Sequence, residues 1–182
     1  TSNPMIIDYV NSKMRSDFLD VYLGAHCAFC LSTTSGFDQI PSIFRKPVAF
    51  ITVPLVFFET FLEKALIITK HHYSKIKKRN LTLSEICSSD ISCSFGTEKY
   101  KEKNIDLVDN TPREIEDLAI EMMDRVEDKW NSNEADNKLQ KKFWNIYLSS
   151  NYNKFFQNKK FHGEVRAKFS ARYLSNNPNW LL

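Results

Sequence analysis

The sequence predicts an α/β protein with a Rossmann-like parallel sheet flanked by helices, and with extra helices toward the C-terminal end. Two short apolar runs, residues 29–31 and 48–51, have the length and composition of buried strands. Between them, apolar residues recur at helical spacing, at Phe37, Ile40, Ile43 and Phe44. A strand, a short helix and a second strand form a βαβ unit, in which the two strands are parallel neighbours.

Length and composition fit a folded protein of ordinary domain size. The chain has 182 residues, of which 42% are hydrophobic and 13% aromatic, which argues against intrinsic disorder. The net charge of +3 is too small to indicate nucleic-acid binding. The longest apolar stretch is interrupted by polar residues and falls short of a membrane span. We predict a nucleotide-sugar-binding domain over residues 1–130 and a helical extension over 131–182 that packs on it.

The turn between the first strand and the helix carries the predicted chemistry. A strand that ends in hydroxyls and glycine and leads directly into a helix presents free N–H groups and the positive helix end, which suits a phosphate. The residues of this turn are Ser32, Thr33, Thr34, Ser35 and Gly36. Gly36 would let a phosphate approach the backbone closely. In the alternative interpretation, Thr34 or Ser35 simply caps the helix.

Several stretches carry a resemblance to a known enzyme class. T-S-G, a helix, Lys-Pro-Val and an apolar strand together resemble the donor-binding half of GT-B glycosyltransferases. The wider chain resembles one bacterial family of surface-polysaccharide (capsule or lipopolysaccharide) glycosyltransferases, in the stretches SDFLDVYLGAHCAFCLSTTSG, IPSIFRKPV, LTLSEI, DNTPREIEDLAIEM and YLSNNPNWLL. They occur in the family's order and cover nearly the whole chain.

The resemblance implies a nucleotide-diphosphate sugar as substrate and a glycan or glycolipid as acceptor, with no bound metal or other cofactor. It implies a cytoplasmic enzyme, peripheral at the inner face of the plasma membrane. The chain would be an incomplete GT-B enzyme that begins within the second domain. The acceptor-binding first domain and its general base would then be missing, and the isolated chain would transfer no sugar. No residue here is assigned as catalytic.

The resemblance also implies contacts to the ribose and the base. Many GT-B enzymes bind the ribose with a glutamate on the helix after the turn, but this position is Ile40 here, which leaves Asp38 and Gln39 as the nearest polar candidates. Pro54, at the end of the second strand, is expected near the base. Asp8 and Tyr9 follow a short apolar run, and the sequence places them either near the base or sugar or on the surface.

A basic stretch follows the predicted strand over residues 65–69. It contains Lys70, His71, His72, Lys75, Lys77, Lys78 and Arg79. One interpretation is a solvated loop. The other is that Lys70, at a strand end, meets the donor diphosphate while the remaining cations attract an anionic acceptor or a membrane surface.

The other predicted elements are structural. They are a helix capped by Ser16 and packed on the sheet, a short helix over 81–87, a loop over 93–104, an edge strand over 105–108, a helix capped by Thr111, one after Glu134, and a last one with Val165, Phe169 and Tyr173. Apolar surface around Phe143 and Phe169 is expected to be exposed. Cysteines 27, 30, 87 and 93 are interpreted as reduced thiols, because they lack the ligand spacing of a zinc site.

Two rival functions follow from the same residues. One is a non-enzymatic Rossmann-like module that binds a phosphorylated ligand or serves in regulation. The other is a structural domain in which the turn does nothing more than cap the helix.

Overall fold

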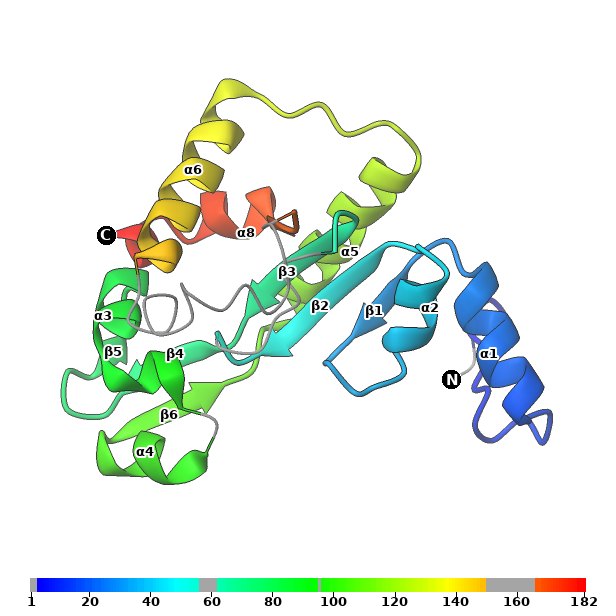
Figure 1. The fold of residues 1–182 in the computed structure, drawn as a ribbon, viewed down its shortest axis with the longest axis horizontal. Helices are drawn as coiled ribbons and strands as arrows, with labels where there is room; N and C mark the ends of the chain where they lie inside the picture. Colours follow the sequence, from blue (N-terminus) through cyan, green and yellow to red (C-terminus); the bar gives the residue numbers. More distant parts are fainter. Residues whose placement is uncertain (1–2, 56–61, 95, 150–165) are drawn as a thin grey trace.

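The parallel sheet predicted from the sequence forms the centre of the molecule. The computed structural model describes residues 3–55, 62–94, 96–149 and 166–182 (Figure 1). All four strands of this sheet run parallel, in the order β1-β2-β3-β7. They are β1 (Cys30–Ser32), β2 (Val48–Val53), β3 (Ala65–Thr69) and β7 (Lys168–Phe169). Helix α5 (Pro112–Val126) packs against β2 and β3. The fold is therefore α/β and Rossmann-like.

The βαβ unit is confirmed. Helix α2 (Gln39–Ile43) connects β1 to β2, and the two strands pair in parallel from Cys30 opposite Val48 to Ser32 opposite Phe50. Strand β1 begins one residue later than predicted. The strand β3 is confirmed at its predicted bounds, and all five of its side chains are buried. Such complete burial is expected of a strand covered on both faces.

The basic stretch is only partly a loop: its exposed middle, residues 75–78 with Lys75, Lys77 and Lys78, is the turn between two strands, whereas the residues on either side of it are not loop. Residues His71–Ser74 form β4 and Arg79–Asn80 form β5, in a second, antiparallel sheet of order β5-β4-β6. Strand β6 (Ile105–Val108) is the predicted edge strand, at the edge of this second sheet. Acids lie beside the cations of this segment. Lys75 is 2.9 Å from Asp106, and Arg79 is 2.7 Å from Glu85.

Short helices cover the second sheet. Helix α3 (Leu83–Ser88) starts with a capping box between Thr82 and Glu85, and a 3-10 helix (Asp90–Cys93) follows it. The loop predicted over residues 93–104 is wrong, because Thr97–Glu102 form α4. This helix buries Tyr100, and Lys99 bonds to Asp90 at 3.2 Å. One buried aromatic and an ion pair to a neighbouring element thus stabilise a segment whose sequence is otherwise polar.

The described residues of the C-terminal part include helices and one more strand of the parallel sheet. Helix α6 (Glu134–Leu148) follows as predicted, and α8 (Ala171–Asn176) leads into a 3-10 helix (Pro178–Leu181). The predicted last helix is confirmed at Tyr173, which lies in α8, and is wrong at Phe169, because Phe169 pairs with Ile67 in the parallel sheet. Val165 lies outside the described residues. Segment 131–182 therefore contributes a strand to the sheet, while the domain boundary at 130 stays a prediction.

Phe143 and Phe169 are fully buried, so the expected exposed apolar surface around them is wrong. Their rings lie 4.2 Å apart, centroid to centroid, and Trp180 packs on both. This aromatic cluster joins α6, β7 and the C-terminal 3-10 helix. It buries its apolar area within the chain itself.

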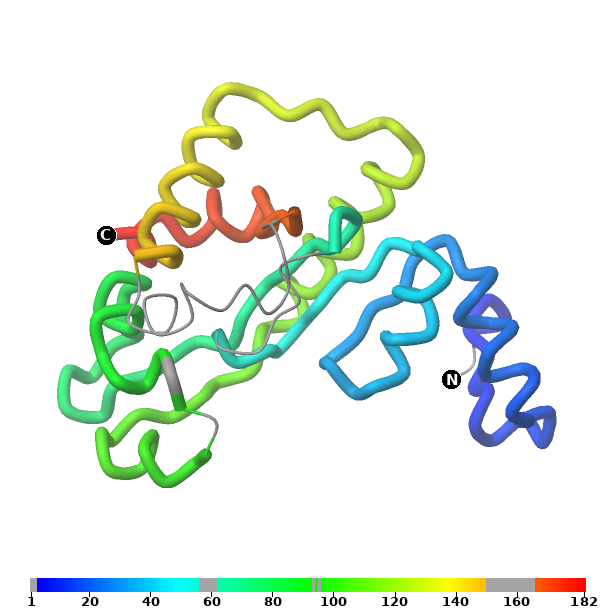
Figure 2. The backbone as a smooth tube through the Cα atoms, viewed as in Figure 1, coloured from blue at the N-terminus to red at the C-terminus, as the bar shows by residue number. Residues whose placement is uncertain are grey.

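Helix α1 (Asp17–His26) lies at one end of the molecule, as Figure 2 shows. Its predicted N-cap is confirmed, because the Ser16 hydroxyl accepts a bond from the Leu19 N–H. Its predicted packing on the sheet is wrong: it contacts α2, and Phe18 is 72% exposed. Gly24 is buried at this contact, where a Cβ would lie only 2.7 Å from Ile40 Cγ2. The absence of a side chain lets α1 approach α2.

Replacing Gly24 by alanine should therefore destabilise the protein. In an open helix this change stabilises by about 1 kcal/mol, but here the clash with Ile40 should reverse the sign and cost about 1–3 kcal/mol. Chemical unfolding of Gly24→Ala measures the loss. Ile40→Ala removes the clashing Cγ2 atom, so the double variant should recover more than about 0.5 kcal/mol relative to the sum of the single changes. Additive effects would contradict this account of the α1–α2 contact.

Candidate functional site

The turn after β1 lies at the carboxyl edge of the parallel sheet, where ligands of open α/β folds bind. Thr33, Thr34, Ser35 and Gly36 are exposed, and Ser32 is buried as the last residue of β1. The helix that follows has Asp38 as its N-cap and no capping bond from a side chain. The alternative in which Thr34 or Ser35 only caps the helix is therefore wrong.

A carboxylate lies inside the turn. Asp38 is 2% exposed and accepts bonds from the Ser32 hydroxyl at 2.8 Å, the Gly36 N–H at 3.2 Å and the Gln39 amide at 3.1 Å. The expectation of free N–H groups in this turn is therefore wrong at Gly36. Hydrogen-bond donors do converge in the turn, as the sequence predicts. Two of them, the Ser32 hydroxyl and the Gly36 N–H, donate to the Asp38 carboxylate of the chain itself. The hydroxyls of Thr33, Thr34 and Ser35 remain on the exposed face.

Two threonines at this edge have a strained backbone. Thr34 has a φ of 62° and Thr52 a φ of 49°. Among the described non-glycine residues with positive φ, these two are the only β-branched ones, for which the left-handed region is especially unfavourable. Each lies two positions beyond the paired residues Ser32 and Phe50. Thr34 therefore lies just after β1 and Thr52 near the end of the neighbouring strand β2, at the same level of the sheet.

Asn110 holds the second of these strained positions. Its side-chain oxygen accepts the Thr52 N–H at 2.8 Å, and its amide donates to the Thr69 carbonyl at 2.9 Å. The register between β2 and β3 is irregular here, between Phe50 and Val53. The buried Asn110 thus replaces ladder bonds that the irregularity removes. The sequence around Asn110 predicts only the start of a helix. No local pattern in it indicates that the Asn110 side chain bonds to two strands.

Lys70 lies immediately after β3, as predicted, and forms an ion pair with Asp109. Asp109 is 69% exposed and Lys70 24%. Its neighbour His71 bonds to Glu114 at 2.9 Å, and the Tyr173 hydroxyl lies 3.5 Å from the other His71 ring nitrogen. Burial alone would raise the pKa of Glu114, but bonds from His71 and the Thr111 N–H lower it to about 2. These charges are balanced within the chain.

The remaining predicted contacts lie in different places. Asp8 and Tyr9 belong to the segment before α1, where Asp8 bonds to Asn11 and the Tyr9 hydroxyl donates to Asp20 at 2.8 Å. Their hydrogen bonds stay within this segment and α1, and in the described parts of the chain none of them reaches the turn. Gln39 is exposed beside Asp38, and Pro54 follows β2 directly. Contacts of these residues to a ribose or a base stay predictions.

The thiols are poorly suited to nucleophilic or metal chemistry. Burial raises the pKa of Cys30 to about 11 and that of Cys87 to about 12, so both are protonated at neutral pH. In the described parts of the chain, no three histidine, cysteine, aspartate or glutamate side chains are grouped as metal ligands. Within those same parts, no helix combines the length and apolar character needed to cross a membrane.

Comparisons with known proteins return nothing for this chain: no protein-family model matches it, and neither a curated protein nor a solved structure was found to be similar.

His72 should make the stability of the fold depend on pH. It is 2% exposed, its Nδ1 donates to the Lys70 carbonyl, and burial lowers its pKa to about 4, against 6.5 for an ordinary histidine. Between these values the unfolded chain binds a proton and the folded chain does not. Stability contributed by neutral His72 is therefore complete above pH 6.5 and is lost as the pH falls toward 4, by up to about 3 kcal/mol.

Chemical unfolding between pH 7.5 and pH 4.5 checks this expectation. His72→Gln keeps a polar side chain but cannot titrate, so its stability should fall less over the same interval. Equal losses in the two proteins would show that other groups cause the pH dependence.

The strained turn gives a second prediction. Thr34→Gly should stabilise the fold by about 1–2 kcal/mol, because glycine adopts the left-handed backbone without strain. It should also destabilise the fold by about 0.5–1 kcal/mol, because glycine gives the unfolded chain more conformational entropy. The variant should be as stable as the wild type or up to about 1 kcal/mol more stable. Thr33→Gly, at the neighbouring exposed position without positive φ, should instead lose about 0.5–1 kcal/mol. If both variants lose stability equally in urea unfolding, Thr34 is not strained.

Proposed function

We propose that this chain is the donor-binding part of a GT-B-type glycosyltransferase. It would act with a nucleotide-diphosphate sugar as donor and a glycan or glycolipid as acceptor, in the assembly of bacterial surface polysaccharide. The observation that carries the proposal is the strained pair Thr34 and Thr52 at the carboxyl edge. Backbone strain gathers at ligand sites, and this edge is the usual ligand position in parallel sheets. The ordered sequence stretches add the resemblance to the enzyme family.

The diphosphate is proposed to lie over Thr33, Thr34 and Ser35, beside Gly36. Space is available there, since a Cβ built on Gly36 meets no atom within 4 Å. Asp38 shapes the turn, and its negative charge opposes a phosphate placed deep in it. We therefore propose that hydroxyl donors, more than backbone N–H groups, contact the ligand. Lys70 would leave its ion pair with Asp109 and pair with the more highly charged diphosphate, which would neutralise part of the negative charge of the ligand.

The other partners follow from the same proposal. The acceptor and the general base would belong to an acceptor-binding domain, so no residue of this chain is given a catalytic role. The enzyme would work in the cytoplasm, with its lipid-linked or glycan acceptor at the membrane surface. Neither a metal nor another cofactor is assigned to the diphosphate, because hydroxyls and cations supply the electrostatic contacts.

Calorimetry with UDP, GDP, CDP, ADP and inorganic pyrophosphate tests the proposal. One nucleoside diphosphate should bind, and Gly36→Val should weaken it at least about tenfold, a cost of about 1.4 kcal/mol, because the branched side chain fills the space over the turn. Gly36→Ala shares the backbone strain of a φ of 86° with less bulk, and should lose less affinity. Thermal unfolding of both variants confirms that they fold.

Lys70→Ala and Lys78→Ala form the matched control, because each removes one positive charge. Affinity should fall more for Lys70→Ala, and equal losses would indicate a general charge effect. The proposal fails if no nucleoside diphosphate binds or if Gly36→Val binds as well as the wild type. Pyrophosphate binding as tight as that of every nucleotide would instead favour the non-enzymatic phosphate-binding module.

A further inference from the structure

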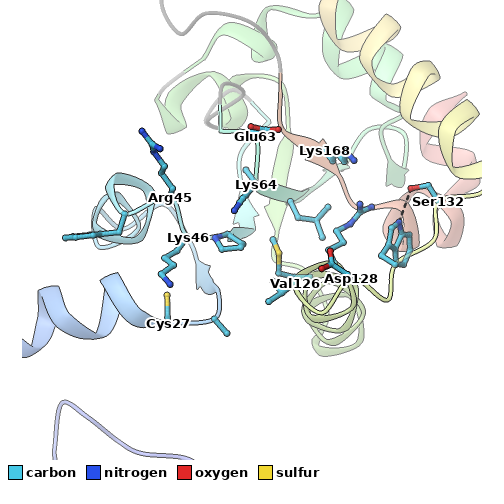
Figure 3. A pocket seen from close by; sticks show the side chains of 17 residues that line it. Cys27, Arg45, Lys46, Glu63, Lys64, Val126, Asp128, Ser132 and Lys168 are labelled. Carbon is cyan, nitrogen blue, oxygen red and sulfur yellow. Dashed lines mark hydrogen bonds between the residues drawn. The ribbon is translucent and has the colours of Figure 1, made fainter.

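A large pocket opens at the opposite, amino edge of the parallel sheet (Figure 3). Its volume is about 820 Å³, within the range of small-molecule sites. Its walls come from the segments that enter three strands, at Cys27 and Ala28 before β1, Lys46 and Pro47 before β2, and Lys64 before β3. Lys168 of β7 and the end of α5 complete it. Because these residues precede the strands, the pocket is separate from the turn after β1.

Cations outnumber acids in the pocket lining. The charged lining residues are Arg45, Lys46, Lys64, Arg125 and Lys168, against Glu63 and Asp128. Arg125 is compensated by the fully buried Glu121, at 2.7 Å. Within the described parts of the chain, none of the other four cations forms an ion pair. Figure 3 shows Lys46 and Lys64 on one side of the pocket and Lys168 on the other.

The placement of these cations indicates the kind of ligand. Like charges around one hollow repel one another, and a bound anion turns that repulsion into attraction. The pocket faces the C-terminal ends of α2 and α5, at Phe44 and Val126, whose partial negative charge opposes an anion, so attraction for an anion has to come from the cationic side chains. Recognition would rest on separate side chains, which suits several negative groups spaced along one ligand.

The uncharged part of the lining suits the skeleton of such a ligand. Pro47, Leu66, Met122 and Trp130 give the pocket apolar surface, and Arg125 stacks on Trp130 at 4.6 Å from its ring centre. A ligand with a carbon or sugar skeleton can bury its ring faces there while its anionic groups reach the lysines. A fully hydrated inorganic ion would leave this surface uncovered.

We propose that this pocket binds an oligoanionic small ligand, one with several phosphate or carboxylate groups, at a site distinct from the nucleotide turn. The pocket would hold the ligand through Lys46, Lys64 and Lys168, with Arg45 at its rim. The site does not depend on the proposed glycosyltransferase function, since none of its residues belongs to the turn Ser32–Gly36. It gives the amino edge of the sheet a binding role of its own.

Two probes distinguish the two possible kinds of anionic group on the ligand. Sodium tripolyphosphate carries phosphates, and a tetramer of galacturonic acid carries carboxylates. Calorimetry at about 20 mM NaCl, a low ionic strength, and at about 150 mM NaCl, close to the physiological one, should show binding of at least one probe, weaker in the higher salt. Inorganic phosphate, with one anionic group, should bind at least about tenfold more weakly. The probe that binds more tightly identifies the source of the anionic groups.

Lys64→Ala/Lys168→Ala removes two of the pocket cations and should weaken the tighter probe at least about tenfold. Lys141→Ala/Lys142→Ala removes the same charge from the exposed face of α6 and should change affinity less than about twofold. Gly36→Val should leave this binding unchanged, which separates it from nucleotide binding. Binding of neither probe would overturn the proposal, and so would equal losses in the two double variants. Thermal unfolding checks that each variant is folded.

Discussion

The side chain of Asn110 fixes the carboxyl edge of the parallel sheet. It joins the Thr52 N–H of β2 to the Thr69 carbonyl of β3 at the point where their register slips. Without it, the part-buried Thr52 N–H and the buried Thr69 carbonyl would lose this partner, and a buried group left without one costs about 1–3 kcal/mol. Asn110 also directly precedes Thr111, the cap of α5. One amide therefore links the strained Thr52 of β2 to the end of β3, directly before the residue that caps the long helix.

Internal carboxylates occupy places where an external anion could bind. Asp38 accepts the donors of the turn after β1. Glu121, reaching from α5, accepts the Ser170 hydroxyl and two N–H groups at the start of α8. Each carboxylate is buried and its charge is balanced by hydrogen bonds, in the second case with Arg125 as well. The convergence of donors at a strand-to-helix junction can be predicted from sequence, but the identity of the anion that satisfies them cannot.

Local signals explain what the sequence could predict. The βαβ unit rests on short apolar runs, and the caps at Thr82 and Thr111 rest on spacing within one turn of helix. The errors concern distant partners. The two ends of the basic stretch become strands because β4 pairs with β5 and with the distant β6, and Phe169 leaves its expected helix to pair with β3. The lysines of the amino-edge pocket are likewise scattered along the chain, and no motif unites them.

The pairing of β7 with β3 has a consequence for the newly made chain. Ile67 and its partner Phe169 are about a hundred residues apart, so translation at about 5–20 residues per second delays their contact by several seconds. During that interval β3, with four apolar side chains and Thr69, is an unpaired edge beside β2. Such an edge is a template for association between chains. Solubility during synthesis therefore depends on how quickly β7 arrives, or on a chaperone that covers β3 until it does.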